Sequence, residues 1–401
     1  MSIAKPDEGK THPGIRFNSP AAFWTGIFSV ACGVLAHLPE FVGARSMGFH
    51  MAHMPMSPLM LAGMLTIVVG LALTSYGLVP FSVLSHPPVA ASARVHFRAL
   101  DSARLTGQHW GLLFVLGIAL VIDVMKPATL GFVVPGLKAE YGISTRAAAA
   151  LPFVALTGTT IGSLLWGLLA DRIGRRAAIL LSSVLFIATS ICGFMPSFGW
   201  NLFTCLLMGM SAGGMLPIVY ALMTEAMPAK NRGWLVVLHG GMGTVLGYLL
   251  ASGLATVLEP HFTWRSLWLA GLPTGLLMLM LNRWIPESPR FLLEHGRFDE
   301  AEEVMRRFGV VVTRDMAPQH EAAQSRSAAE SHGRSKLLTI FRTPYRLQTL
   351  TVGMYGLGWG LVNWGFLTFT PTILRDRGLD AQSASEVLFW SALIAVPATL
   401  S

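Results

Sequence analysis

An aspartate and a lysine stand close together inside one of the most apolar stretches of the chain. Asp123 and Lys126 lie within the stretch 110–134 and are three positions apart, so they share one face of a helix and can pair. Asp123 falls about 20 Å along this helix, a little past the middle of a bilayer. Ionisable side chains at that depth are costly and usually face a cavity or a partner. The two residues predict either charged side chains that face a cavity within the membrane or a buried structural ion pair whose lysine extends outward.

A second group of charged residues lies in a short loop between two apolar stretches. Its residues are Gly167, Asp171, Arg172, Gly174, Arg175 and Arg176. Glycine permits a tight turn there, and aspartate and arginine at helix ends pair with each other and with the helix dipoles. Arginines that only orient the chain in a membrane would leave the aspartate and the two glycines unexplained. The loop therefore predicts a network of charges.

Soft-metal binding is the alternative chemistry, in the loop between the first two apolar stretches. His50, His53 and Met54 lie there among further methionines, and imidazole and thioether groups can bind Cu(I). Two histidines without a further fixed ligand are a weak signal, and methionine packs readily in apolar helices. We therefore expect no metal and no cofactor. The cysteines are expected to be small buried hydrophobes without a disulfide framework; they are Cys32, Cys192 and Cys205.

The elements that must position these residues are membrane helices. The 401 residues are 53% hydrophobic and 12% charged, with a mean hydropathy of +0.56, which excludes a water-soluble multidomain enzyme. Stretches apolar enough to cross a bilayer recur along the chain. They lie near 21–38, 58–80, 110–134, 148–170, 177–194, 200–222, 234–257, 266–285 and 347–373, and a tenth starts near 387 and is cut off by the chain end. The sequence predicts an all-α polytopic membrane protein.

The distribution of basic residues predicts a cytoplasmic N-terminus. The net charge of +8 comes from loops between apolar stretches, which favours orientation in a membrane over nucleic-acid binding. Short segments assigned to the inside carry Lys5, Lys10, Arg16, Arg94, Arg98, Arg104, Arg172, Arg175, Arg176, Lys230 and Arg232. Those assigned to the outside carry the smaller set Arg45, Lys138, Arg146, Arg265, Arg375 and Arg377. The polar stretch from Arg283 to Arg346 then also lies inside.

Three motifs, in order, resemble those of the major facilitator superfamily. Residues 167–176 (GLLADRIGRR) resemble the GxxxDRxGRR signature after the second core helix, and residues 225–233 (EAMPAKNRG) resemble the ExxPxxxRG element after the fourth. Residues 286–292 (PESPRFL) resemble the PESPR element after the sixth, found in the sugar-porter and metabolite:proton symporter branches. The resemblance covers about residues 107–401 and leaves the first hundred outside.

This resemblance implies a major facilitator fold whose N-terminal half is complete and whose C-terminal half is incomplete. Residues 1–106 are then an extension with two transmembrane helices, and 107–285 are the six-helix half. Residues 286–345 are a cytoplasmic linker with an amphipathic helix, and 346–401 hold the first two helices of a truncated second half. We expect either a truncated product or fragment, or a partner that supplies the missing C-terminal segment.

In the family, the motif residues form a cytoplasmic charge network that holds the two halves together in one conformation. The resemblance assigns this latch to Gly167, Asp171, Arg172, Gly174, Arg175, Arg176, Glu225, Arg232, Glu287 and Arg290. Related acid:proton symporters carry two acids where this chain has Asp123 and Lys126, so the second acid is replaced. We therefore expect Asp123 to couple protons and Lys126 to attract an anionic substrate. Candidates for lining the substrate site in the seventh core helix are Trp359, Asn363 and Trp364.

The function implied is transport and not catalysis. We expect a secondary active transporter of a bacterial inner membrane that moves a small organic acid with protons by alternating access. Its partners are then the substrate, protons and the lipid bilayer. A uniporter, a sugar or polyol porter, a metal-binding membrane protein and a non-transporting fragment remain alternatives.

Overall fold

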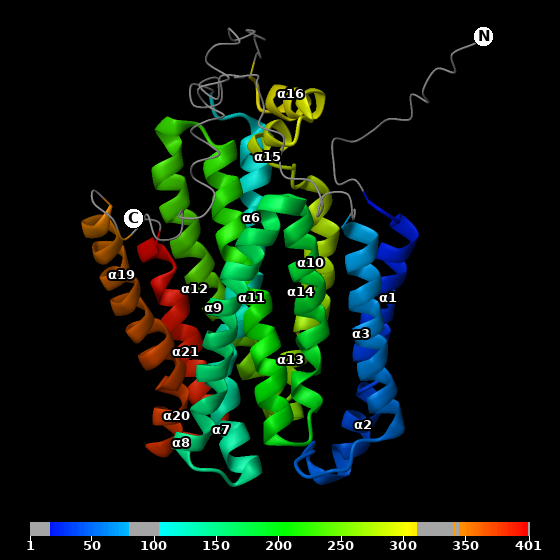
Figure 1. The fold of residues 1–401 in the computed structure, drawn as a ribbon. Helices are drawn as coiled ribbons and strands as arrows, with labels where there is room; N and C mark the ends of the chain where they lie inside the picture. The colour runs from blue at the N-terminus through cyan, green and yellow to red at the C-terminus, as the bar shows by residue number, and fades with distance from the viewer. Residues whose placement is uncertain (1–16, 80–103, 311–340, 342–344, 400–401) are drawn as a thin grey trace, which may run out of the picture.

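The computed structural model describes residues 17–79, 104–310, 341 and 345–399 (Figure 1). Every regular element within these ranges is helical, and seven helical segments are long and apolar enough to cross a membrane. The predicted all-α polytopic membrane fold is confirmed. Several basic residues used to predict the orientation lie outside the described residues, as does most of the predicted linker; they are Lys5, Lys10, Arg16, Arg94, Arg98 and the stretch 317–336.

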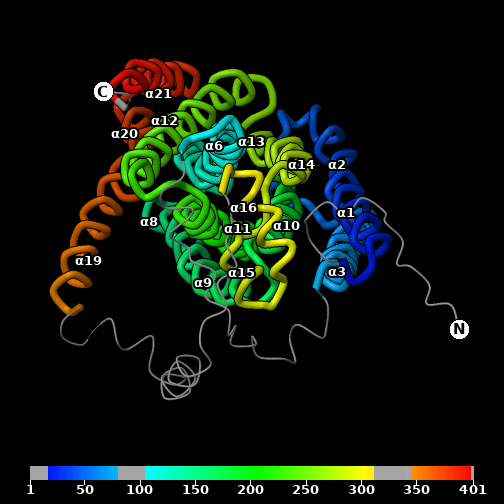
Figure 2. The backbone as a smooth tube through the Cα atoms, turned by 90° about the horizontal axis from the view of Figure 1, so that it is seen from above, coloured from blue at the N-terminus to red at the C-terminus, as the bar shows by residue number. Residues whose placement is uncertain are grey.

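The N-terminal extension is an antiparallel helical hairpin on one side of the molecule (Figures 1 and 2). Its elements are α1 (Pro20–Leu35), α2 (Leu38–Gly43), the 3₁₀ helix η1 (Ala44–Met47) and α3 (Pro58–Leu78). Both long helices begin at a serine followed by proline: the Oγ atoms of Ser19 and Ser57 accept hydrogen bonds of 3.3 Å from the amides of Ala22 and Met60. Serine caps the free amides, and proline loses no hydrogen bond in the first turn.

Glycines let α1 and α3 approach each other closely. Gly26 and Gly33 on α1 face Gly63, Gly70 and Gly77 on α3, and within each helix these glycines are seven residues apart. A Cβ atom on Gly33 would lie 2.7 Å from the carbonyl oxygen of Gly63. Lipid gives two apolar helices no hydrophobic reason to associate, so close backbone packing must hold them together.

The helical core, residues 107–284, follows in sequence. Its elements are α6 (Gly107–Ala128), α7 (Leu130–Tyr141), α8 (Thr145–Ala148), α9 (Ala150–Ile173), α10 (Arg175–Ala188), η2 (Thr189–Phe194), α11 (Phe198–Ala226), α12 (Ala229–Phe262), α13 (Ser266–Leu269), α14 (Gly271–Leu281) and η3 (Asn282–Trp284). α6 packs against α11 and α12, while α10 lies between α11, α14 and the extension. Gly158 and Gly162 of α9 meet the backbone of α11, whose Gly209 and Gly213 meet α9 in return.

Two short helices, α15 (Pro289–Glu294) and α16 (Phe298–Arg307), cover the end of the bundle from which α6 starts (Figure 1). The buried side chains of α16 are Ala301, Val304 and Met305, so this segment has the amphipathic character that the sequence indicates. The last elements are α19 (Arg346–Gly360), the π-helical segment η4 (Leu361–Leu367), α20 (Thr368–Asp376), α21 (Ala381–Ala395) and η5 (Pro397–Thr399). α20 packs on α7 and α21 on α12.

Several of the predicted apolar stretches are interrupted helices, and two of them show this clearly. The stretch 266–285 is divided into α13, α14 and η3, and the stretch 347–373 changes to π-helical geometry at Leu361. In the second case the Thr368 hydroxyl donates to the carbonyl of Asn363, five residues earlier, at 3.4 Å. Gly356, Gly358 and Gly360 precede this point, and glycine weakens a regular helix. The spacing of apolar residues and the hydropathy of the sequence do not reveal such interruptions.

The close contact between α1 and α3 can be tested with one methyl group. We expect Gly70→Ala to lower stability by roughly 1–3 kcal/mol, because overpacking forces backbone shifts. Its Cβ would lie 2.7 Å from the carbonyl oxygen of Gly26. The matched control is Gly43→Ala, whose Cβ would meet nothing within 4 Å. Thermal unfolding in detergent micelles measures both, and equal midpoints would contradict the packing.

Candidate functional site

Asp123 is the buried acid of α6. Its side chain is 3% exposed, and its Oδ1 atom has no hydrogen-bond partner among the described residues. The predicted pair between Asp123 and Lys126 is wrong for this conformation, since the ion pairs of the described chain do not include it. Their spacing of three positions places Asp123 and Lys126 on one side of α6, but the lysine has other partners. Asp123 therefore has no cation to offset its charge.

Lys126 points into the interface between α6 and α10. It is 2% exposed, and its Nζ atom donates to the Thr189 hydroxyl at 2.8 Å and to the Phe186 carbonyl. The same Nζ lies 4.0 Å from the centroid of the Phe186 ring. A carbonyl, a hydroxyl and an aromatic face thus replace the shell of water around the ammonium. The structure therefore differs from the structural ion pair that the sequence suggested. Lys126 does not pair with Asp123, and it does not extend outward.

The loop motif of residues 167–176 forms the predicted charge network in part. The Arg175 guanidinium binds Asp171 Oδ1 at 2.5 Å and Glu225 Oε1 at 3.4 Å. Three consecutive long helices are thereby connected, because Asp171 lies in the last turn of α9, Arg175 begins α10 and Glu225 lies in the last turn of α11. Asp171 is 66% exposed, so this contact is one that solvent can replace.

Glu287 is the buried centre of this cluster. Its Oε1 atom accepts hydrogen bonds from the amides of Arg175 at 2.7 Å, Arg176 at 3.3 Å and Ser288 at 3.0 Å. A carboxylate beside free amides at a helix start is favourable, so Glu287 caps α10 from a distant loop. Burial raises the pKa of Glu287, and these amides and Arg297 partly offset the rise. Gly174 makes room for the carboxylate and has φ +103°, which only glycine adopts readily.

The structure does not bring the remaining predicted latch residues into this cluster. Arg290 pairs with Glu294 at 3.0 Å on the surface, and Arg232 donates to the carbonyl of Met227 at 3.0 Å. A Cβ atom on Gly167 would meet nothing within 4 Å, and Arg172 is exposed. The network of this conformation thus contains Asp171, Gly174, Arg175, Glu225 and Glu287, with the Arg176 amide.

The predicted substrate-lining residues of the seventh core helix lie close to one another. The Asn363 amide donates to the Trp359 carbonyl at 3.1 Å, and the rings of Trp359 and Trp364 meet edge-on at 6.5 Å. All three lie where α19 passes into η4, and neither element has a buried residue. Their role in substrate binding stays a prediction.

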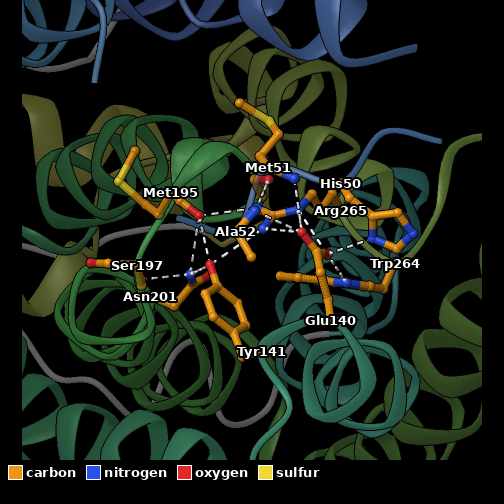
Figure 3. A network of polar contacts seen from close by, with 11 residues as sticks. His50, Met51, Ala52, Glu140, Tyr141, Met195, Ser197, Asn201, Trp264 and Arg265 are labelled. Carbon is orange, nitrogen blue, oxygen red and sulfur yellow. Dashed lines mark hydrogen bonds and ion pairs between the residues drawn. The ribbon is translucent and has the colours of Figure 1, made fainter. Parts of the chain in front are cut away.

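A second charged centre, which sequence reasoning missed, lies at the end of the bundle opposite the Glu287 cluster (Figure 3). It joins neighbouring elements there. Arg265 and Glu140 have side chains 0% and 2% exposed, and Nη2 of the arginine lies 2.7 Å from Oε1 of the acid. The Trp264 indole also donates to Glu140, at 2.9 Å. Arg265 donates further to the carbonyls of Gly193 and Met195 at 2.9 and 3.0 Å. The planar guanidinium can bind several acceptors at once, so one arginine joins α7, η2 and α13.

Glu140 also holds the loop that the sequence suggested for metal binding. The amides of Met51 and Ala52 donate to its Oε1 at 2.8 and 2.9 Å, and His50 Nδ1 lies 3.6 Å from its Oε2. His53 stacks edge-on against Tyr141. The loop of His50, His53 and Met54 thus connects the extension to the core through Glu140 and Tyr141. Within the described part of the chain, no three His, Cys, Asp or Glu side chains gather so that they could hold a metal, and the proposed methionine ligands stay a prediction. The only signal for the connection in the sequence is an acid and an arginine at the ends of apolar stretches.

Comparison with known proteins identifies a transporter family. A family model described as "Sugar (and other) transporter" matches residues 125–400. The niacin transporter NiaP of Acinetobacter baylyi is 25% identical over 299 residues, which are 73% of this chain and 66% of that protein. Synaptic vesicle glycoprotein 2A of Rattus norvegicus is 33% identical over 215 residues, 49% of this chain and 28% of the relative. The chain thus spans less than two thirds of the length of these relatives.

Solved structures share the fold at low sequence identity. The partially occluded inward-open conformation of the xylose transporter XylE from E. coli has a TM-score of 0.55 at 20% identity and covers 73% of this chain and 69% of its own. A second structure is described as the major facilitator superfamily proton:xylose symporter XylE bound to 6-bromo-6-deoxy-D-glucose; its TM-score is 0.57 at 19% identity, with 74% and 69% covered. These structures confirm the predicted major facilitator fold.

The fit between Gly174 and Glu287 can be separated from backbone strain. Gly174→Ala places a Cβ atom against the Glu287 carboxylate, and at φ +103° and ψ 155° it also strains the backbone, in a region that is essentially restricted to glycine. In a Glu287→Ala background the strain remains and the carboxylate is gone. We expect Gly174→Ala to cost roughly 1–3 kcal/mol more in the wild type than in that background, through overpacking. The readout is the thermal unfolding midpoint, and equal losses would show that Glu287 does not require the glycine.

The attachment of the extension loop to Glu140 can be tested by amide hydrogen exchange. In Glu140→Ala the amides of Met51 and Ala52 lose a charged acceptor, so we expect them to exchange about tenfold faster or more. The control is Asp376→Ala, which removes an exposed acid paired with Lys138 at 3.2 Å. Unchanged protection of both amides in Glu140→Ala would mean that other contacts hold the loop.

Proposed function

The chain belongs to the sugar (and other) transporter family of the major facilitator superfamily, and we propose that it moves a small organic metabolite together with protons. The predictions of a transporter and of a protein that is not an enzyme are confirmed at the level of the family. The observation that carries proton coupling is Asp123, a carboxyl group that is 3% exposed and that, among the described residues, has neither an ion pair nor a partner for Oδ1.

Asp123 is suited to carry a proton because nothing else offsets its charge. A buried carboxylate without a partner is strongly unfavourable, and a bound proton removes that charge. Lys126, one turn further along, is occupied by Phe186 and Thr189. The free energy of the conformation that buries Asp123 therefore depends on whether this side chain is protonated. Such dependence is what coupling requires, since a ligand shifts a conformational equilibrium only by binding its states differently.

A small organic acid is the substrate class we propose. One relative is a niacin transporter, and niacin is a carboxylic acid. Lys126 supplies a cation on the same helix as the proton site, and it binds an anion once its contacts to Phe186 and Thr189 are exchanged. Trp359, Asn363 and Trp364 complete the proposed substrate site from η4 and the end of α19. A sugar or polyol is the second candidate, favoured by the description of the family.

We propose alternating access as the mechanism, with the cluster around Arg175 and Glu287 as the cytoplasmic latch. Arg175 contacts two acids at once, from α9 and α11, while the Glu287 carboxylate fixes the start of α10. Breaking the exposed contact to Asp171 is inexpensive, since such pairs contribute about 0–1 kcal/mol. The latch residues outside the cluster, Gly167, Arg172, Arg232 and Arg290, are proposed to act in another state of the cycle.

A bacterial inner membrane with the N-terminus on the cytoplasmic side is the proposed location. The excess of basic residues in the segments assigned inside supports this orientation. It places the Glu287 cluster in the cytoplasm and the Glu140 centre on the outer side.

Replacement of Asp123 by asparagine tests the proposal. In the complete product of the gene, reconstituted in vesicles, we expect Asp123→Asn to abolish accumulation of substrate against a gradient while counterflow exchange continues. The neutral amide imitates the protonated acid but cannot release a proton. Asp376→Asn is the control, because Asp376 is an exposed acid. Uphill accumulation by Asp123→Asn would place the proton site elsewhere.

A further inference from the structure

His239 of α12 binds two backbone carbonyls at once. Its Nδ1 atom lies 3.1 Å from the carbonyl oxygen of Leu235, one turn earlier in α12, and its Nε2 atom lies 2.9 Å from that of Leu113 in α6. A Cβ atom on Gly117 would come within 3.6 Å of the ring, so a small residue on α6 leaves room for it. The imidazole therefore forms a bridge between two neighbouring helices of the core.

Both contacts can be hydrogen bonds only if the ring carries two protons. A carbonyl oxygen only accepts, and a neutral imidazole has one N–H and one bare nitrogen. In the neutral form, one bare nitrogen would face a carbonyl oxygen at about the distance of a hydrogen bond, which is repulsive. The geometry thus selects the imidazolium.

Another histidine of the chain shows that this arrangement is not a general consequence of helical position. His37 makes the same contact one turn back, from Nδ1 to the Gly33 carbonyl at 2.8 Å. Its Nε2 atom, however, has no partner among the described residues. The one hydrogen bond of His37 needs one ring proton, whereas the two contacts of His239 need two.

No acid neutralises the charge of His239. The other ionisable side chains of α12 are Lys230, Arg232, Tyr248, Glu259 and His261. Those on the helices packed around it are His109, Asp123 and Lys126 of α6, Cys205, Tyr220 and Glu225 of α11, and Glu386 of α21, while α13 has none. None of them forms an ion pair or hydrogen bond with His239 in the described chain. Backbone dipoles alone stabilise the imidazolium, so the bridge depends directly on its proton.

Tyr220 lies near this bridge and also interacts with the proposed proton site further along α6. A Cβ atom on Gly240, the residue after His239, would lie 2.8 Å from the Tyr220 hydroxyl. Tyr220 is also close enough to Asp123 to interact with it electrostatically. Leu113 precedes Asp123 by ten residues, so the bridge lies about 15 Å nearer the start of α6.

We propose that His239 is a second protonation site, at which an imidazolium clamps α12 to α6 and loss of one proton opens the clamp. On deprotonation the ring keeps one N–H and can donate to only one of the two carbonyls. The other contact becomes repulsive, and the two helices are free to separate at this level. The part that this step plays in transport rests on the proposed function; the protonation state itself does not.

Nitrogen NMR of the histidine rings tests the clamp directly. The full chain, labelled with ¹⁵N-histidine and embedded in lipid vesicles, is compared with His239→Gln and with the matched control His37→Gln. We expect the signals lost in His239→Gln to be those of a ring with two protonated nitrogens at neutral pH. The signals lost in His37→Gln should be those of a neutral ring. A neutral His239 would overturn the proposal.

A transport measurement separates this proposal from that for Asp123. We expect the rate of counterflow exchange by the complete gene product to change as pH is raised. In His239→Gln this dependence of the rate on pH should be lost, because glutamine does not titrate. A neutral His239 by NMR refutes the clamp whatever Asp123 does. Uphill accumulation by Asp123→Asn refutes the proposed coupling even if His239 is an imidazolium. A pH profile of His239→Gln identical to that of the wild type would also overturn the clamp.

Discussion

The constraint on which this structure depends is that polar groups inside a membrane must find their partners within the protein. Water cannot solvate them there, so each charge requires carbonyls, hydroxyls or an opposite charge from a neighbouring helix. Lys126 takes a carbonyl and a hydroxyl from the junction of α10 and η2, and Arg265 takes two carbonyls and a carboxylate. Asp123 stands out because it lacks such a set.

Much of the fold could be predicted from the sequence because membrane helices are local features. Hydropathy located the helices, and the motif residues Asp171, Arg175, Glu225 and Glu287 do meet in one cluster. The partners of Lys126 could not be predicted, since Phe186 is sixty residues away and only packing brings its carbonyl near. The Glu140 centre was missed for the same reason, and no spacing rule relates residues 51, 140 and 265.

The extension is attached to the core in two physically different ways. Within the bilayer, α1 and α3 pack on α10 through apolar side chains, with Val30 and Val34 on one side and Val184 and Ile187 on the other. At one end of the bundle, the amides of Met51 and Ala52 in the loop bind the Glu140 carboxylate. Apolar contacts allow helices to slide, whereas hydrogen bonds fix position and direction. The loop therefore fixes where the hairpin lies on the core.

The two ends of the six-helix bundle differ in how costly their charged contacts are to break. At one end, Glu140 and Arg265 are almost fully buried, and separating such a pair leaves an uncompensated charge at a cost of about 3–5 kcal/mol. At the other end the Arg175 network includes the exposed Asp171, whose contact water can replace for about 0–1 kcal/mol. The bundle is thus fixed at the end that holds Glu140 and adjustable at the end that holds Arg175. His239 bridges α6 and α12 toward that adjustable end, where a single proton is enough to change how the helices meet.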